Sequence, residues 1–348
     1  MPASRLLLLV ILTFVLAACE RDSGREEAAE DELQLLQPDE PAQTDSDTPH
    51  PDAETVVEVV AELPAVAVAL AASADNRLFV ALQNDIETDT SPLVEISNGR
   101  ALAWPDDKPP ASGKLRGGIR ALHIDDEGAL WILDASPRLL RIDLMQNQYT
   151  REIDLAAAFP GADHQPDGLG VDAELGVAYI IDSGQPGLVV LDLYTDEARR
   201  MLENTSTLQP ASDDPDTRAR MVLSPDLRYL FWQPRGSGDI YRMETEVLQF
   251  TDLPDEELAA MVEHFGTPGP AQALSMDPAG LLYVAVDENA ETALRRIDHF
   301  GTPSLVSHET GLSKVTAMGA TRGGDLLLGI RGDEDQPPRL LRLLGAAR

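Results

Sequence analysis

Cysteine is almost missing from this sequence. The single cysteine among 348 residues is Cys19. An internal disulfide is therefore excluded, and so are zinc or iron–sulfur centres that need several thiolates. No phosphate-binding loop or haem motif occurs, and no Ser, His and acid are spaced as a nucleophile with its base. We therefore predict that packing holds the fold together, and we predict no cofactor and no metal site.

Basic side chains are also scarce. The chain has 27 Lys and Arg against 60 Asp and Glu, a formal charge of -33. Only three of the 27 are lysines, at Lys108, Lys114 and Lys314. A chain this acidic would be repelled by a polyanion, so we exclude nucleic acid as a partner.

Residues 1–19 read as a targeting segment. Arg5 is the charged start, residues 6–15 are the apolar centre, and Leu-Ala-Ala-Cys ends the segment at Cys19. The apolar run is too short for a permanent transmembrane helix. The ending resembles the lipobox of bacterial lipoproteins, which implies a lipid on Cys19, although an ordinary cleaved signal would also account for the segment. We expect a lipid-anchored protein of the bacterial cell envelope, periplasmic or at the outer membrane, and Glu20 after the cysteine favours the outer membrane.

Residues 20–54 form an acidic linker. They hold 13 Asp or Glu and two Arg, and almost no large apolar residue follows Leu36. Such a segment cannot bury enough apolar surface to offset the entropy of ordering. We predict a disordered tether that extends by self-repulsion.

The rest of the chain, 55–348, repeats one sequence pattern six times. The pattern is an apolar strand, a turn with Asp, Gly or Pro, and a second apolar or aromatic strand. Equivalent second-strand residues lie 52, 48, 52, 52 and 44 residues apart, at Leu78, Leu130, Ala178, Leu230, Leu282 and Leu326. This is the period of a four-stranded propeller blade. The sequence therefore predicts an all-β fold, a six-bladed β-propeller.

Two segments complete the predicted propeller. The sixth blade runs out of chain after its third strand, and we expect the Val-rich residues 55–63 to supply its outer strand. After blade four, Pro254, three acidic residues and Gly266 suit the start and end of a helix over 254–265. We expect that helix to pack against the propeller through one apolar face.

Several blade motifs carry a family resemblance. Taken in their order along the chain, these motifs resemble the bacterial branch of the yellow and major royal jelly protein family. They are residues 128–134, 137–144, 178–193, 223–234 and 240–243. Residues 255–266 are similar to a helix that this family carries after its fourth blade. The resemblance covers about residues 60–345 and implies a secreted or envelope-located six-bladed propeller, whose insect members bind small ligands in the central channel. Relatives often start the inner strands of blades four and five with Asp-Gly, but here only Asp167-Gly168 in blade three keeps that pair.

Ligand contacts in a propeller come from the starts of its inner strands, because these converge on the axial channel. Blade one offers only Ala65 and Val66 there. The polar candidates of the other blades are Arg120, Asp167, Arg220, Gln272, Lys314 and Thr316. Three cations against one carboxylate favour an anionic or carboxylate-bearing ligand. The same charges could instead only neutralise one another or the acidic surface.

Three functions follow from these features. We expect a non-catalytic binding protein that takes a small molecule in its channel. A metal-dependent lactonase similar to the gluconolactonase family is the enzymatic alternative, but Asp167 is the only carboxylate at a suitable position. A scaffold that binds an envelope protein is the third.

Other polar residues are expected to have structural roles. Asp134 and Asp182 are expected to cap turns, and His123 is expected to be a hydrogen-bonded core imidazole.

Overall fold

The computed structural model describes residues 56–83, 91–105, 118–214, 217–249, 253–288, 291–307, 312 and 314–344. These residues belong to one compact unit, His50–Arg348. The predicted signal peptide with Cys19 and the acidic tether lie outside the described residues. Among those described, no helix is long and apolar enough to cross a membrane.

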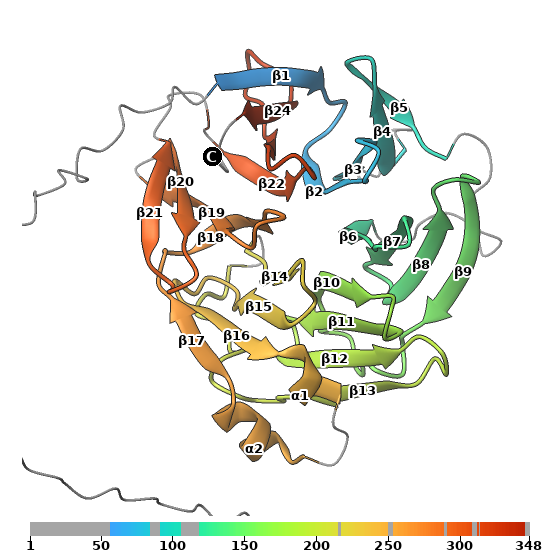
Figure 1. The fold of residues 1–348 in the computed structure, drawn as a ribbon, viewed down its shortest axis with the longest axis vertical. Helices are drawn as coiled ribbons and strands as arrows, with labels where there is room; N and C mark the ends of the chain where they lie inside the picture. Colours follow the sequence, from blue (N-terminus) through green and yellow to red (C-terminus); the bar gives the residue numbers. More distant parts are fainter. Residues whose placement is uncertain are drawn as a thin grey trace, which may run out of the picture. The chain divides into compact units, whose positions relative to one another are not determined.

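Six four-stranded antiparallel sheets form a ring of blades (Figure 1). Blades one to three are built from β2 (Ala67–Ala72), β3 (Leu78–Leu82), β4 (Leu93–Ser97) and β5 (Arg100–Ala103); β6 (Ile119–Ile124), β7 (Ala129–Asp134), β8 (Arg138–Asp143) and β9 (Gln148–Asp154); and β10 (Pro166–Asp172), β11 (Val177–Asp182), β12 (Gly187–Asp192) and β13 (Ala198–Met201). Blades four and five are built from β14 (Arg220–Leu223), β15 (Tyr229–Gln233), β16 (Ile240–Glu244) and β17 (Glu263–Gly266); and β18 (Ala271–Met276), β19 (Leu282–Glu288), β20 (Glu291–Ile297) and β21 (Pro303–Ser307). The six-bladed fold predicted from the repeat is confirmed.

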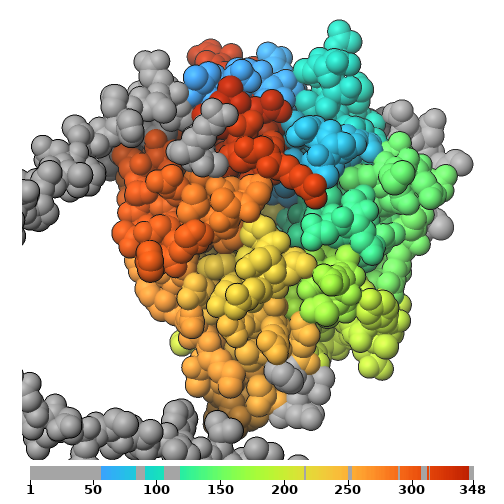
Figure 2. Space-filling model, in the orientation of Figure 1, coloured from blue at the N-terminus to red at the C-terminus, as the bar shows by residue number. Residues whose placement is uncertain are grey.

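Blade six joins the two ends of the described chain. Its strands are β22 (Val315–Ala320), β23 (Leu326–Ile330), β24 (Arg339–Leu344) and β1 (Val56–Glu62), and β1 pairs with β24 antiparallel. Figure 2 shows the blue surface of β1 beside the red surface of the C-terminal strands. The Val-rich segment therefore closes the ring as its sequence pattern predicts, and β24 is left with no open edge.

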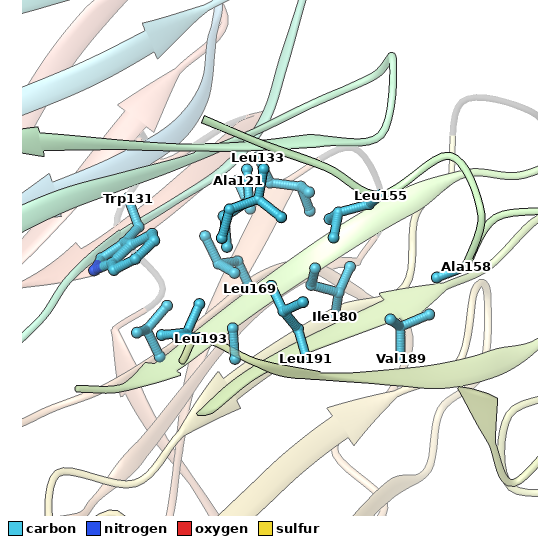
Figure 3. Packing of buried hydrophobic residues seen from close by; sticks show 14 of the residues in the cluster. Ala121, Trp131, Leu133, Leu155, Ala158, Leu169, Ile180, Val189, Leu191 and Leu193 are labelled. Carbon is cyan, nitrogen blue, oxygen red and sulfur yellow. The ribbon is translucent and has the colours of Figure 1, made fainter. Parts of the chain in front are cut away.

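The core lies between the blades. Each pair of neighbouring blades shares one cluster of buried apolar side chains in the described part of the chain. Between blades two and three, Trp131 and Leu133 pack against Leu169, Ile180 and Val189 (Figure 3). The second strands β3, β7 and β23 are buried along their whole length, because a blade covers each of their faces.

The expected helix over 254–265 is wrong in extent and place. Two short helices, α1 (Thr245–Gln249) and α2 (Asp255–Ala260), lie inside blade four, between its third and fourth strands. Residues 263–266 form the outer strand β17, since Arg242 of β16 pairs with Glu263 and Ile240 with Gly266. Blade four needs an edge strand, and this requirement overrides the helical pattern. Leu258 of α2 is buried against the core between blades three and four, as expected for a packing helix.

Candidate functional site

One-residue bulges mark the starts of five inner strands. In each, the pairing with the second strand shifts by one residue, and the residue passed over is Val68, Arg120, Asp167, Gln272 or Thr316. A bulge leaves its extra residue outside the ladder and turns that side chain in a new direction. The sequence placed Arg120, Asp167, Gln272 and Thr316 correctly at equivalent points. In blade one this point is Val68, rather than Ala65 or Val66.

Blade four departs from the pattern. The residue just after the bulge is small in the other blades: Ala69, Ala121, Gly168, Ala273 and Ala317. Arg220 holds this place in blade four, where it pairs with Gln233. Arg220 is therefore not equivalent to Arg120 and Asp167, as the sequence alignment assumed, but lies one step further along its strand. A guanidinium thus occupies a position that elsewhere takes only a methyl group or a hydrogen.

A cavity of about 100 Å³ lies among these inner strands. We call it the channel cavity. Its walls are mostly small or apolar, and its polar side chains come from Arg120, Asp167, Arg220 and Thr316. Gln272 and Lys314 are not among its lining residues. Lys314 is exposed and precedes β22, with φ +61°. The structure therefore brings together four of the six predicted residues around the cavity and leaves Gln272 and Lys314 outside its lining.

Asp167 is the most buried charged group of the channel cavity, with its side chain 1% exposed. Its Oδ2 accepts hydrogen bonds from the Ser183 hydroxyl and from the backbone N–H of Ala219. Its Oδ1 is buried and accepts no hydrogen bond from the described residues, and Arg120 Nη1 lies 3.9 Å from it. Burial raises the pKa of Asp167, and the Ser183 hydrogen bond and the nearby arginines, Arg218 foremost, oppose that rise.

Arg220 carries a positive charge that its surroundings disfavour. Burial and the neighbouring guanidinium of Arg218 lower its pKa to about 10, and Asp167 only partly offsets them. The group stays protonated at neutral pH, yet its Nε is buried without a hydrogen-bond partner in the described structure. Arg120 and Arg220 together outweigh Asp167, the one carboxylate among the lining residues of the channel cavity. The channel cavity is therefore positive inside an acidic protein, an arrangement that attracts anions.

Sequence reasoning missed two residues that shape this site. Ser183 holds Asp167, and Arg218 acts on both Asp167 and Arg220 through its charge. Ser183 directly follows the last residue of β11. The contact between Ser183 and Asp167 depends on the register of β10 and β11, and the sequence does not show that register.

Cation binding finds little support at the channel cavity. Among the described residues, no group of three or more His, Cys, Asp or Glu is placed to hold a metal ion. The three arginines around Asp167 also repel a divalent cation. A lactonase mechanism needs such an ion on several oxygen ligands. Nothing in the described geometry therefore favours the lactonase alternative.

The other polar residues singled out in the sequence have structural roles. Asp134 Oδ1 accepts the backbone N–H groups of Ser136 and Arg138, and Asp182 Oδ1 accepts those of Gly184 and Gln185. Both carboxylates therefore cap turns, as expected. His123 lies in β6 opposite Trp131, and burial lowers its pKa.

Gly168 is required by the contact between blades three and four. A Cβ added at Gly168 would lie 2.7 Å from Met221 Cβ and 3.0 Å from Ile181 Cγ2. Because Met221 Cβ is bonded directly to the backbone of blade four, blades three and four would have to move apart.

We therefore expect Gly168→Ala to lower the free energy of unfolding by about 1–3 kcal/mol. Urea denaturation measures this, with Gly323→Ala as the matched control, because a Cβ at Gly323 meets nothing closer than 3.7 Å. An unchanged midpoint for Gly168→Ala would show that the contact between blades three and four is looser than described.

The family model for major royal jelly protein matches residues 119–304, more than half of the chain. The chain belongs to the major royal jelly protein family. This confirms the resemblance read from the blade motifs. No curated protein matches the chain in sequence.

Several solved structures are similar in fold to this family member. A protein of unknown function from Bacteroides thetaiotaomicron has a TM-score of 0.60 at 12% identity, covering 83% of this chain and 75% of its own. Regucalcin from Agrobacterium tumefaciens, described as a calcium-binding protein, has a TM-score of 0.55 at 14% identity, with 83% and 94% covered. Virginiamycin B lyase from Staphylococcus aureus has a TM-score of 0.50 at 14% identity, with 79% and 82% covered. Identities this low establish the shared fold alone.

Proposed function

We propose that this member of the major royal jelly protein family binds a small anion in its channel cavity. The observation that carries the proposal is Arg220, a half-buried arginine whose Nε is buried with no described hydrogen-bond partner, at a strand position that is Ala or Gly in the other blades. A buried, poorly compensated charge destabilises a fold. Its presence beside a cavity is explained if a ligand supplies the missing acceptor.

The size of the channel cavity limits the ligand. Sites for drug-sized molecules usually measure 300–1,000 Å³, whereas this cavity measures about 100 Å³. Such a space holds a few water molecules or one compact group. Carboxylate and phosphate groups are the anions that a guanidinium binds with paired hydrogen bonds. We therefore propose a ligand that inserts one carboxylate or phosphate group.

Anion binding is tested directly with acetate and inorganic phosphate. We expect either anion to shift the Nε–H resonance of Arg220 in a saturable way in NMR titrations of the propeller. The sign of the pH dependence follows from Asp167 when the affinity is expressed for one ionisation state of the anion. Because the pKa of Asp167 is raised, this carboxylate loses its charge at a higher pH than an ordinary carboxyl, so the affinity for that form of the anion should increase as the pH falls. If neither anion gives a saturable shift, the proposal is wrong.

We also propose that the propeller is anchored to the cell envelope through a lipid on Cys19. The proposal rests on the Leu-Ala-Ala-Cys ending of the targeting segment and on the absence of any other cysteine. We expect expression of the full chain with a labelled fatty acid to label the wild type and not Cys19→Ser, with Ser23→Cys in the Cys19→Ser background as a control for nonspecific thiol acylation. Equal labelling of wild type and Cys19→Ser would contradict the anchor.

A further inference from the structure

A second cavity lies between blades four and five, away from the channel. It measures about 230 Å³, more than twice the channel cavity. We call it the interblade pocket. Blade four supplies three aromatic rings and an arginine, and blade five supplies a methionine and the exposed His299 at the rim. The larger side chains of the pocket are Tyr229, Phe231, Arg242, Phe265, Met276 and His299.

The aromatic walls of the interblade pocket are fixed by contacts with one another. The rings of Phe231 and Phe265 meet edge to face, with centroids 4.9 Å apart and planes at 74°. The Tyr229 ring lies 6.2 Å from that of Phe231. Arg242 places its guanidinium carbon 4.9 Å from the Tyr229 centroid and 5.0 Å from the Phe265 centroid. A pocket built this way is organised before any ligand enters, which reduces the entropy lost on binding.

The polar groups of Arg242 and Tyr229 are already paired, and the carboxylate of Asp226, which also lines the pocket, accepts a hydrogen bond from the Ser224 hydroxyl at 2.6 Å. Arg242 Nε donates to Glu263 Oε2 at 2.7 Å, and the Tyr229 hydroxyl donates to Glu244 Oε1 at 3.1 Å. The ring faces are occupied by a guanidinium, so a cationic ligand would meet a like charge. An anion gains little because Glu263 neutralises Arg242. The remaining attraction is for a neutral planar ring, through edge-to-face contacts and the sulfur of Met276.

An exposed aromatic ring follows the rim residue His299 in the chain. Phe300, next to His299 in the turn between β20 and β21, is 92% exposed. Its backbone N–H is held by Asp298 Oδ1, so the turn that presents this ring is ordered. Phe300 therefore adds exposed apolar surface one residue away from His299, which lines the pocket.

We propose that the interblade pocket binds a neutral aromatic molecule of one or two rings, such as an indole or a phenol. The volume of about 230 Å³ is below that of sites for drug-sized ligands and suits a single small ring system. This inference goes beyond the proposed anion site and does not depend on it, because the two cavities share no lining residue.

Indole is the probe that tests the interblade pocket. Saturation-transfer NMR on the propeller should show saturable binding of indole with a dissociation constant of about 1 mM or tighter. Ala279, an exposed lining residue, offers a variant that fills the pocket without touching the core. We expect Ala279→Trp to weaken indole binding at least about tenfold.

The matched control is Glu127→Trp, which places the same ring at the same turn position in blade two, where Asp125 and Gly128 correspond to Asp277 and Gly280. Phe265→Leu is a second variant that removes a ring with little loss of volume, and it should also weaken binding while Glu127→Trp does not. Absence of saturable indole binding overturns the proposal. Binding that survives Ala279→Trp, or a preference for tetramethylammonium over indole, overturns it as well.

Discussion

A variant of this chain that begins at Leu63 is expected to be so much less stable that it shows no cooperative unfolding transition at room temperature. The deletion removes β1, the only partner of β24 on its outer side in the described sheets. Six residue pairs join the two strands, from Val56 with Leu344 to Glu62 with Arg339. A net loss of about 0.5–1.5 kcal/mol for each ladder hydrogen bond adds up to several kcal/mol, a large part of the ~5–15 kcal/mol that typically stabilises a domain.

The lost apolar contacts increase this effect. Ala61 is buried, and Val57 and Val60 pack against the clusters on the two sides of blade six. The deletion also leaves β24 as an open edge that can pair with a second chain. Urea denaturation followed by the fluorescence of the buried Trp131 and Trp232 measures the outcome. A variant that begins at Thr55 keeps β1 and is the control, and equal stability of the two variants would show that blade six does not need its fourth strand.

The repeat was enough to predict the fold because it reflects packing that every blade needs. Second strands such as β7 and β23 are buried at every position and mostly apolar, since each is covered on both faces. Closure by β1 followed from counting strands in the last blade. The error at 254–265 came from local preference: Asp255, Glu256 and Glu257 do begin a helix, but the chain must then turn back to give blade four its outer strand.

The candidate site could be predicted only in part, because register is not visible in sequence. The bulges displace one residue in each of five inner strands, and no composition signal marks them. Arg220 was aligned with Asp167 for this reason, although it corresponds to Gly168. Where relatives often carry Asp-Gly, blade four therefore reads Ala219-Arg220 and blade five reads Gln272-Ala273. Of these residues, Arg220 adds a cation to the lining of the channel cavity.

The substitution Arg220→Ala is expected to separate function from stability. It removes the guanidinium that we propose as the main ligand of the anion, and a hydrogen bond to a charged group contributes about 1.5–3 kcal/mol. Affinity for acetate or phosphate should therefore fall about 10- to 100-fold. The fold should not suffer, because alanine is the residue that blades one, two, five and six already place there.

Two further variants test the sign of this effect. Asp167→Asn removes the one carboxylate of the channel cavity and should tighten anion binding, while Arg100→Gln removes an exposed positive charge on β5 and should leave it unchanged. Binding constants come from titration calorimetry, and stabilities come from urea denaturation of the same preparations. A residue that only packs would show the opposite pattern, with lower stability and unaltered affinity. If Arg220→Ala unfolds the domain or binds anions as the wild type does, Arg220 is part of the scaffold and the anion site must lie elsewhere.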